Sequence, residues 1–164
     1  MSKPQRQSGT SVQDAIQQTK PFRSVGQEAL IALLLTTERL RWPLQDLLSS
    51  RGDLTPQQYN VLRILRGAGK RGLPTLEIAA RMIERTPGIT RMIDRLERKQ
   101  LVQRVRAESD RRQVLVSISP EGLQLLRSLG KAVDELDEQL LDALTQRETR
   151  DLIRLLDKVR NSLS

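Results

Sequence analysis

The sequence feature that most restricts the fold is a stretch near the middle of the chain, residues 110–122, which reads DRRQVLVSISPEG. It begins with a short polar segment that contains two arginines. Alternating apolar residues then predict a short strand with Val114, Val116 and Ile118 on its buried face. Ser119 follows as a helix N-cap and Pro120 fits the first helical position. The stretch therefore predicts a basic hairpin tip, a strand and a helix start in direct succession.

The composition narrows the chemistry that the chain is able to perform. Its 164 residues fit one domain, and they include no Cys and no His. Disulfides, thiol redox chemistry, imidazole acid–base catalysis and the usual zinc ligand sets are therefore excluded. No set of nucleophile, base and orienting group is visible either, and neither is a glycine loop that would cradle a phosphate. We expect no catalytic residue, no metal site, no cofactor and no enzymatic activity.

The sequence also predicts where the protein works. Residues 1–19 are polar, and no apolar run approaches the length of about 18 residues that a membrane span needs. The chain is therefore predicted to be soluble and cytoplasmic, with no membrane partner.

The positive charge is concentrated in the middle of the chain. The whole sequence has a net charge of +8, and residues 53–118 alone hold 14 basic and 7 acidic residues. Residues 119–164 have a net charge of −2. A localised positive block of this kind indicates a surface that binds phosphates.

The apolar pattern divides the chain into functional parts. Residues 1–22 are rich in Gln, Ser and Thr and predict a mobile N-terminal extension. Residues 23–164 are predicted to form a single domain, in which 53–118 are the basic module and 23–52 and 119–164 are flanking helices. Leucines at helical spacing between residues 24 and 49 indicate the first long helix, and Pro43 predicts a kink in it.

The flanking helices predict self-association. Two helix starts mark the borders of these parts. Thr55 and Pro56 are expected to start a helix at the beginning of the basic module, and Thr145 is expected to cap the last helix. The apolar faces of the first and the last two helices exceed what a small basic module is able to cover. We expect a homodimer, and the alternative is that these helices only complete the core of a monomer.

Two more helices are predicted in the basic module, between the helix that starts at Thr55 and the hairpin. Thr75 is the expected cap of a short helix through Ile83. Four of its residues are available to the core, and these are Leu76, Ile78, Ala79 and Met82. After a three-residue turn, Thr86 is the expected cap of the next helix, with Pro87 in its first position.

This next helix is amphipathic. Ile89, Met92, Ile93 and Leu96 fall at the spacing of one helical face. The opposite face is polar and mostly basic, and it consists of Thr90, Arg91, Asp94, Arg95 and Arg98. Such a helix is suited to lie in a DNA major groove, although an ordinary solvated surface helix has the same pattern. Residues 101–105 then predict the first strand of a hairpin that precedes the strand at residue 114.

The segment from Leu54 to Gly122 resembles the winged helix-turn-helix of the MarR family of bacterial transcription regulators. The resemblance is carried by the hairpin stretch at residues 110–122 and by the ITRMIDRLE stretch at residues 89–97. It implies a mainly α fold with a small β-hairpin wing, flanked by dimerisation helices. The DNA-contacting residues that it implies are Thr86, Pro87, Thr90, Arg91, Arg95, Arg111 and Arg112.

The resemblance also implies a division of labour among these residues. Thr86, Thr90, Arg91 and Arg95 would meet the major groove. Arg111 at the tip of the wing would enter the adjacent minor groove. Arg112 would either grip a phosphate or pair with Asp110.

Two positions depart from the family pattern. The family often has Gly where Gln100 stands, so Gln100 is predicted to adopt a left-handed backbone conformation at some cost. The pair Glu84–Arg85 likewise occupies a turn where the family often has Gly, which leaves the geometry of that turn open.

A ligand site is the last expectation. Trp42 and Tyr59 lie on helices that approach a ligand cleft in this family, and Arg39 and Arg41 are close in sequence to Trp42. A small aromatic or anionic effector is the ligand that this set would suit. Core packing is the alternative role for the two aromatic residues, and it is the one that we favour.

Three classes of function compete to explain these features. A ligand-responsive dimeric repressor that binds a pseudo-palindromic operator in double-stranded DNA accounts for most of these features. An architectural or RNA-binding basic protein is the alternative, but only 2% of the residues are aromatic, which disfavours modules that stack bases. An enzyme is the third class, and the missing catalytic groups disfavour it.

Overall fold

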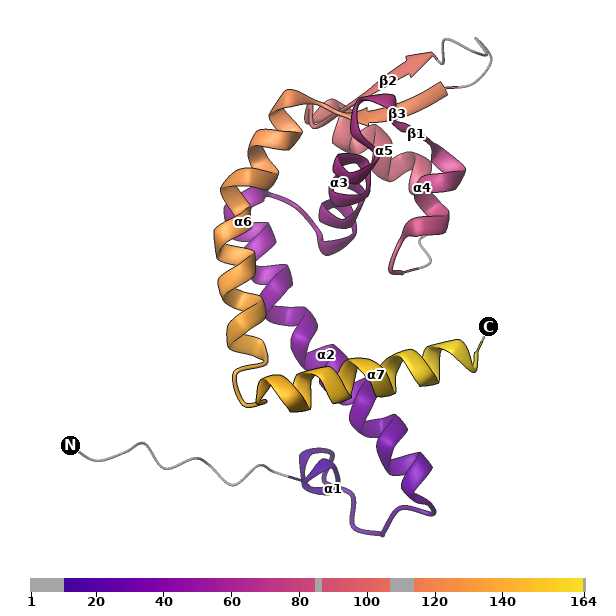
Figure 1. Ribbon diagram of the computed structural model, residues 1–164, viewed down its shortest axis with the longest axis vertical. Helices are drawn as coiled ribbons and strands as arrows, with labels where there is room; N and C mark the ends of the chain where they lie inside the picture. The colour runs from indigo at the N-terminus through magenta and orange to yellow at the C-terminus, as the bar shows by residue number, and fades with distance from the viewer. Residues whose placement is uncertain (1–10, 85–86, 107–113, 164) are drawn as a thin grey trace, which may run out of the picture. The chain divides into compact units, whose positions relative to one another are not determined.

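The computed structural model describes residues 11–84, 87–106 and 114–163 (Figure 1). These residues are mainly helical, as predicted, and they include a small three-stranded antiparallel sheet, of which only the two-stranded hairpin was predicted. The chain divides into two units, residues 1–42 and 43–164.

The N-terminal unit contains a short helix and the first part of a long one. Helix α1 covers Val12–Ala15, and the hydroxyl of Ser11 accepts a hydrogen bond from the amide of Asp14 at 3.1 Å. Helix α2 covers Val25–Gly52, so it runs through Pro43 into the second unit. The long helix predicted between residues 24 and 49 is therefore confirmed.

Helix α3, Pro56–Ala68, begins the C-terminal unit's core. Thr55 caps it as predicted, and Gln58 completes a capping box, in which each side chain accepts a hydrogen bond from the other residue's amide. Val61, Leu62 and Leu65 are fully buried on the inner face of this helix. A single turn of 3₁₀ helix at Gly69–Arg71 follows.

The sheet has the strand order β1-β3-β2. Strands β2, Val102–Arg106, and β3, Val114–Ile118, form the predicted hairpin. The third strand, β1, consists only of Leu73–Pro74 and pairs with β3, and the apolar pattern did not predict it. Two residues are too few to create a recognisable alternation, so this strand depends on its partner.

The predicted burial of β3 is only partly correct. Val116 and Ile118 are buried as expected, but Val114 is half exposed and Ser117 is buried. The backbone of Gly72 lies against this part of β3, because a Cβ atom there would be 3.3 Å from the Cβ of Ser117. The same added atom would be 2.6 Å from the carbonyl oxygen of Val116, so only glycine permits this close approach. The segment before β1 therefore lies alongside β3 next to Ser117, a neighbour that the alternation of apolar residues could not reveal.

Helix α4 differs from the prediction at its start and on its buried face. It covers Thr75–Arg81, and Pro74 occupies the N-cap position with an extended backbone, so Thr75 is already helical and caps nothing. Ile78 is fully buried, whereas Leu76 is 83% exposed and Ile83 lies beyond the helix end. The helix has only two turns, so a single face contacts the core. The prediction that Leu76 contributes to the core is wrong.

Helices α6 and α7 end the chain. Helix α6, Pro120–Leu140, is capped by Ser119, whose hydroxyl accepts a hydrogen bond from Gly122 at 2.9 Å, as the sequence predicts. Helix α7, Gln146–Asn161, begins with a capping box of Thr145 and Glu148. The core of the unit joins residues from α3, α4, α6, the hairpin and the helix that precedes it. None of the residues of α7 is buried.

Candidate nucleic-acid interface

Helix α5, Ile89–Arg98, presents a basic face on an apolar anchor. Ile93 and Leu96 are fully buried in the core, and Ile89 and Met92 pack against it partly buried. The predicted inner face is therefore confirmed. Rotation of α5 would expose these apolar side chains to water, so the buried face fixes the direction in which the opposite, polar face points.

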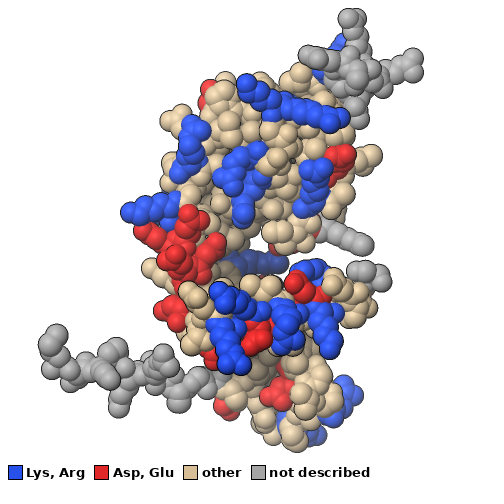
Figure 2. Space-filling model, in the orientation of Figure 1, with Lys and Arg blue, Asp and Glu red and all other residues tan. Residues whose placement is uncertain are grey.

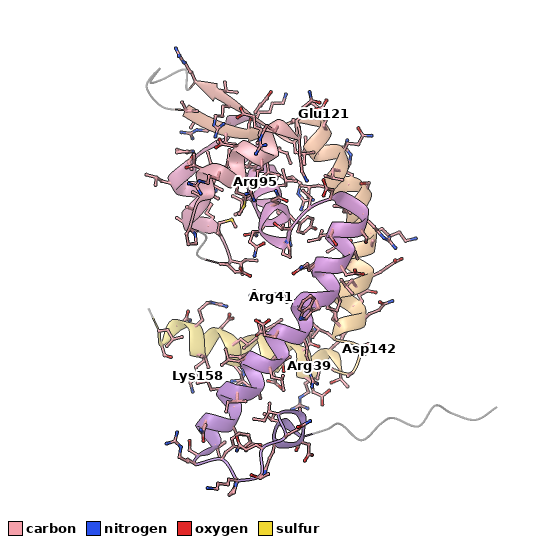
Figure 3. The ribbon with its side chains drawn as sticks, turned by 180° about the vertical axis from the view of Figure 1, so that it is seen from behind. Arg39, Arg41, Arg95, Glu121, Asp142 and Lys158 are labelled. Atoms are coloured by element: carbon pink, nitrogen blue, oxygen red, sulfur yellow. The ribbon has the colours of Figure 1, made fainter. Side chains whose placement is uncertain are left out.

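The outer face of α5 holds the residues that the sequence predicted for it. Thr90, Arg91, Arg95 and Arg98 are exposed, and Asp94 is partly buried. Figure 3 labels Arg95 in this unit, and Figure 2 shows Lys and Arg side chains spread over the surface of the region that contains α3, α4 and α5. The arrangement presents several guanidinium groups and one hydroxyl on a single helical face.

The start of α5 differs from the prediction. Gly88 is the N-cap, with a left-handed backbone at φ +87°, and Ile89 is the first helical residue. Pro87 lies in the exposed turn before it and is not the first helical residue. Thr86, which was predicted as the cap, lies outside the described residues. The chain uses a glycine that accepts positive φ to turn into the helix, so the Thr-Pro start pattern was misleading here.

Strand β2 is attached to α5 through Arg104. Its guanidinium donates to a carboxylate oxygen of Asp94 at 2.5 Å and to one of Glu97. The hydrogen bond to Asp94 is the main reason why the pKa of Arg104 is raised above its ordinary value. Partial burial opposes this change, and the attraction of both carboxylates adds to it. Arg104 could not be identified from the sequence, because its partners are ten and seven residues away along the chain.

The C-terminal end of α5 is attached to the segment that precedes α3. The ammonium of Lys99 donates to the carbonyl of Asp53 and to its carboxylate at 2.7 Å. Gln100 follows with φ +58°, so the predicted left-handed conformation is confirmed. This turn directs the buried residue Leu101 into the start of the hairpin.

The hairpin leads toward the predicted wing tip. Its ladder runs from the pair Val102 and Ile118 to the pair Arg106 and Val114. Arg111 and Arg112, the predicted wing contacts, lie outside the described residues, which resume at residue 114. Their roles stay predictions.

A cavity of about 360 Å³ lies beside α5, and its lining is basic. It is lined by Gln58 of α3 and by Arg95, Arg98 and Lys99. Only Arg95 had been assigned a role in binding. The capping-box spacing of Thr55 and Gln58 is the sequence signal that marks Gln58 as structured, but it gives no hint of these neighbours.

The residues predicted for a ligand site have different surroundings. Trp42 is 67% exposed, so the favoured expectation that it packs in the core is wrong for the single chain. Arg39 and Arg41 are also exposed on α2, as labelled in Figure 3. Tyr59 of α3 is partly buried against the core, as expected, and the guanidinium of Arg63 lies 5.9 Å from its ring centre. Burial raises the pKa of the Tyr59 hydroxyl, and the nearby Arg63 opposes that change.

Within the part of the chain that the structure describes, no group of three or more acidic side chains is arranged to hold a metal ion. No helix among the described residues has both the length and the apolar character to cross a membrane.

A basic helix on an apolar anchor, preceded by a short helix and followed by a β-hairpin, is a winged helix-turn-helix. This class of protein binds DNA and regulates transcription.

Comparison with known proteins identifies the family. Residues 54–114 match the model of the MarR family. The MarR transcription factor of Planctomyces limnophilus is 39% identical, with a TM-score of 0.63 over 84% of this chain and 98% of its own. The transcriptional regulator FarR of Neisseria gonorrhoeae is 26% identical over 88% of this chain and 99% of its own length. A mutant MarR of Escherichia coli, solved with operator DNA, is 28% identical, with a TM-score of 0.69 over 78% of this chain and 90% of its own. The chain belongs to the MarR family of transcriptional regulators, as the sequence predicted.

Proposed function

We propose that the protein is a dimeric, sequence-specific repressor that binds a pseudo-palindromic operator. The observation that carries this proposal is the exposed face of α5, where Thr90, Arg91 and Arg95 stand on a helix anchored by Ile93 and Leu96. Specific recognition requires contacts to base edges as well as to phosphates, and arginine is the side chain that most often reads guanine. A diffuse basic protein has no need for such an ordered array, and this disfavours the architectural or RNA-binding alternative.

The individual DNA contacts are part of the proposal. Arg91 and Arg95 are assigned to base edges in the major groove, with Thr90 beside them and Thr86 and Pro87 at the entry to the helix. Arg111 is assigned to the minor groove, where an arginine is attracted by the negative potential of narrow A·T-rich sequence. Arg112 is assigned to a phosphate or to a pair with Asp110.

The proposed dimer is formed by the flanking helices. The four large apolar side chains of α7 that follow are between 37% and 55% exposed in the single chain: Leu152, Ile153, Leu155 and Val159. A helix of 16 residues without a buried member is poorly stabilised on its own. A second copy of the chain would cover these side chains and hold two recognition helices about 34 Å apart, which is the spacing of successive major grooves.

The proposed domain organisation follows the predicted boundaries. Residues 23–52 and 119–164 serve dimerisation, residues 53–118 bind DNA, and residues 1–22 are an extension. The protein acts in the cytoplasm and catalyses no reaction.

A small aromatic or anionic effector is proposed to control operator binding. Trp42, Tyr59, Arg39 and Arg41 are the residues assigned to it, and the exposure of Trp42 is consistent with a role other than core packing. An effector shifts the equilibrium only through a difference in its affinity for the DNA-competent and the incompetent conformations. It would therefore change the spacing of the two recognition helices.

Selection of bound fragments from a genomic DNA pool tests the proposed function. We expect enrichment of a pseudo-palindrome, and competition with unrelated DNA should not displace it at equal concentration. A protein that retains all fragments equally would be the architectural alternative. Screening phenolic and carboxylate compounds against the recovered operator then tests the effector, whose expected effect is roughly 5- to 150-fold in operator affinity.

A further inference from the structure

The turn that follows α5 is fixed to the end of that helix. Residues 99–101 connect α5 to β2, and we call them the joint. The amide of Leu101 donates to the carbonyl of Leu96 at 3.0 Å, and the amide of Lys99 donates to that of Arg95 at 3.1 Å. Leu96 is fully buried and Leu101 is nearly so. A displacement of the joint would therefore displace the C-terminal end of the recognition helix.

Helix α6 is bonded to the joint through Ser119. The hydroxyl of Ser119 donates its proton to the carbonyl of Gln100 at 2.7 Å, while its oxygen accepts from the amide of Gly122. The amide of Ser119 also donates to the carbonyl of Leu101 at 3.1 Å. The backbone of Gly122 lies against that same carbonyl, because an added Cβ atom would collide with it. Ser119 is only 5% exposed, so these hydrogen bonds form in surroundings that largely exclude water.

The end of α2 is bonded to the joint through Asp53. The ammonium of Lys99 donates to the carbonyl oxygen of Asp53 and to its carboxylate, the latter at 2.7 Å. Asp53 has a φ of +48°, in the left-handed region that Asp and Asn enter more readily than other residues with a side chain. It directly follows Gly52, the last residue of α2, whose backbone packs on Leu129 of α6. Both helices that flank the basic module are therefore connected to one three-residue turn.

The two polar contacts exceed what local capping requires. An N-cap needs only the oxygen of Ser119, yet its proton is committed to Gln100 in another element. A lysine at the end of a helix is favoured by the helix dipole alone, yet Lys99 reaches two acceptors of Asp53, 46 residues earlier in the chain. This ion pair is exposed and adds little to stability. Its consequence is a defined position of the end of α5.

We propose that Asp53 and Ser119 are positioning residues for operator recognition, because through the joint they hold α5 at a fixed orientation to both flanking helices. The inference rests on the proposed function, in which the flanking helices form the dimer. In such a dimer, the spacing of the two recognition helices is only as well defined as the connection of each one to the flanking helices. Arg104 attaches α5 to the wing, inside the DNA-binding module, whereas Asp53 and Ser119 attach that module to the helices that dimerise. A preset spacing raises the affinity for two half-sites without any new contact to DNA.

Two variants loosen the joint in different ways. Asp53→Asn removes the charge but retains the shape and the tolerance of positive φ, and the exposed position means that the fold should form as before. Ser119→Ala removes the proton donated to Gln100 together with the cap, while Ser119→Thr keeps the hydroxyl and should behave as wild type. Helix α1 supplies the controls, because Asp14→Asn and Ser11→Ala repeat the two substitutions at an exposed carboxylate and at another N-cap.

The measurement is the ratio of two affinities, one for the palindrome recovered from the genomic selection and one for a duplex that holds a single half-site. Linking two binding events raises affinity by about 10²- to 10⁴-fold when the geometry is right. We expect Asp53→Asn and Ser119→Ala each to lower the ratio by roughly tenfold while half-site affinity is retained, and the controls and Ser119→Thr to keep the wild-type ratio.

The sign of the change in Asp53→Asn separates positioning from simple electrostatics. Removal of a negative charge should tighten binding to any duplex, whereas loss of positioning weakens binding to the palindrome. Tighter binding to both duplexes would mean that Asp53 only withholds Lys99 from phosphates, and this would overturn the proposal. A parallel loss for both duplexes in Ser119→Ala would reduce Ser119 to a structural cap and would overturn its role. Should Ser119→Ala fail to fold, Asp53→Asn alone decides the outcome.

A spectroscopic readout measures the position of the modules without DNA. Because the chain has no cysteine, Lys70→Cys places a single spin label on the exposed 3₁₀ turn of each winged module. We expect a narrow distribution of distances between the two labels of a wild-type dimer, and a broadened or displaced one in Asp53→Asn and Ser119→Ala. Equal distributions and equal affinity ratios in all variants would overturn the proposal. If the wild type is a monomer, or binds the palindrome no more tightly than the half-site, the proposed function fails; if the wild type is a palindrome-selective dimer and both variants match it, the assignment of Asp53 and Ser119 alone fails.

Discussion

The guanidinium of Arg104 and the carboxylate of Asp94 lie 2.5 Å apart and join the wing strand β2 to the recognition helix α5. Glu97 engages the same guanidinium one helical turn further along. Because one rigid planar group spans two carboxylates of the helix, it restricts both the tilt of the hairpin and the rotation of α5. The angle between the wing and the recognition helix is therefore set by side chains that need not touch DNA.

Removing Arg104 should affect DNA binding more than folding. Its side chain is 30% exposed and its partners are 47% and 38% exposed, so each ion pair should contribute about 0.2 to 1 kcal/mol to stability. We expect Arg104→Gln to lower the melting temperature slightly, while operator affinity falls because the wing and the helix no longer hold a fixed angle. Thermal unfolding and binding isotherms measure the two effects. Arg81→Gln, which breaks the exposed pair with Glu77, is the control and should leave operator affinity nearly unchanged.

The variant Arg91→Ala should show whether Arg91 contacts a base edge or a phosphate. If its side chain reads a guanine, Arg91→Ala should cost roughly 1 to 3 kcal/mol of specific affinity and relax the preference at one position of each half-site. Binding of the variant to a set of singly substituted operators measures this. A uniform loss over all sequences would instead make Arg91 a phosphate contact.

Gln100 stores a small amount of backbone strain. Its φ of +58° lies in the left-handed region, which costs an L-residue roughly 1 to 2 kcal/mol. Glycine removes that cost but adds chain entropy to the unfolded state, so Gln100→Gly should stabilise the fold by about 0.5 to 1 kcal/mol. Urea unfolding measures the difference. Gln103→Gly in β2 is the control and should have the opposite sign, because glycine inside a strand is destabilising.

Local capping and periodicity made much of this fold predictable. Thr55, Ser119 and Thr145 each predict the start of a helix, because an N-cap side chain accepts a hydrogen bond from an amide only three residues further along the chain. All three caps are present. The inner face of α5 was equally predictable, because its period is a property of the helix itself.

The features that the sequence did not reveal depend on distant partners. Strand β1 exists because it pairs with β3, and Ser117 is buried because the backbone of Gly72 lies against it. The attachments of α5 have the same origin. Arg104 meets Asp94 and Glu97, and Gln58 meets the basic residues of α5, only after the chain has folded.

The ionisation of Tyr59 should make the fold sensitive to alkaline pH. Burial raises its pKa above the ordinary value of 10.0, so above that pH the folded state retains a proton that the unfolded state has lost. The contribution of Tyr59 to stability should therefore be constant below pH 10.0, and the stability of the fold should fall as the pH rises beyond it. Because Tyr59 is the only tyrosine, the ultraviolet absorbance of tyrosinate reports this group alone. Tyr59→Phe should make the decline less steep, and an unshifted absorbance titration in the wild type would contradict the assignment.

The variant Leu155→Glu should show whether α7 forms the dimer interface. The side chain is 50% exposed in the single chain, and burying a leucine fully contributes about 1.5 to 3 kcal/mol, which Leu155→Glu would forfeit in each copy of a symmetric interface. We expect wild-type protein to sediment at twice the mass of the chain and the variant at the monomer mass. Gln146→Glu, which adds the same charge at an exposed polar position of α7, should remain dimeric. The monomeric variant should also lose much of its affinity for a palindrome, because its two half-sites are no longer bound by one linked particle. A Leu155→Glu protein that stays dimeric would place the interface elsewhere, and a monomer that binds the palindrome as tightly as wild type would remove the dimer from the mechanism.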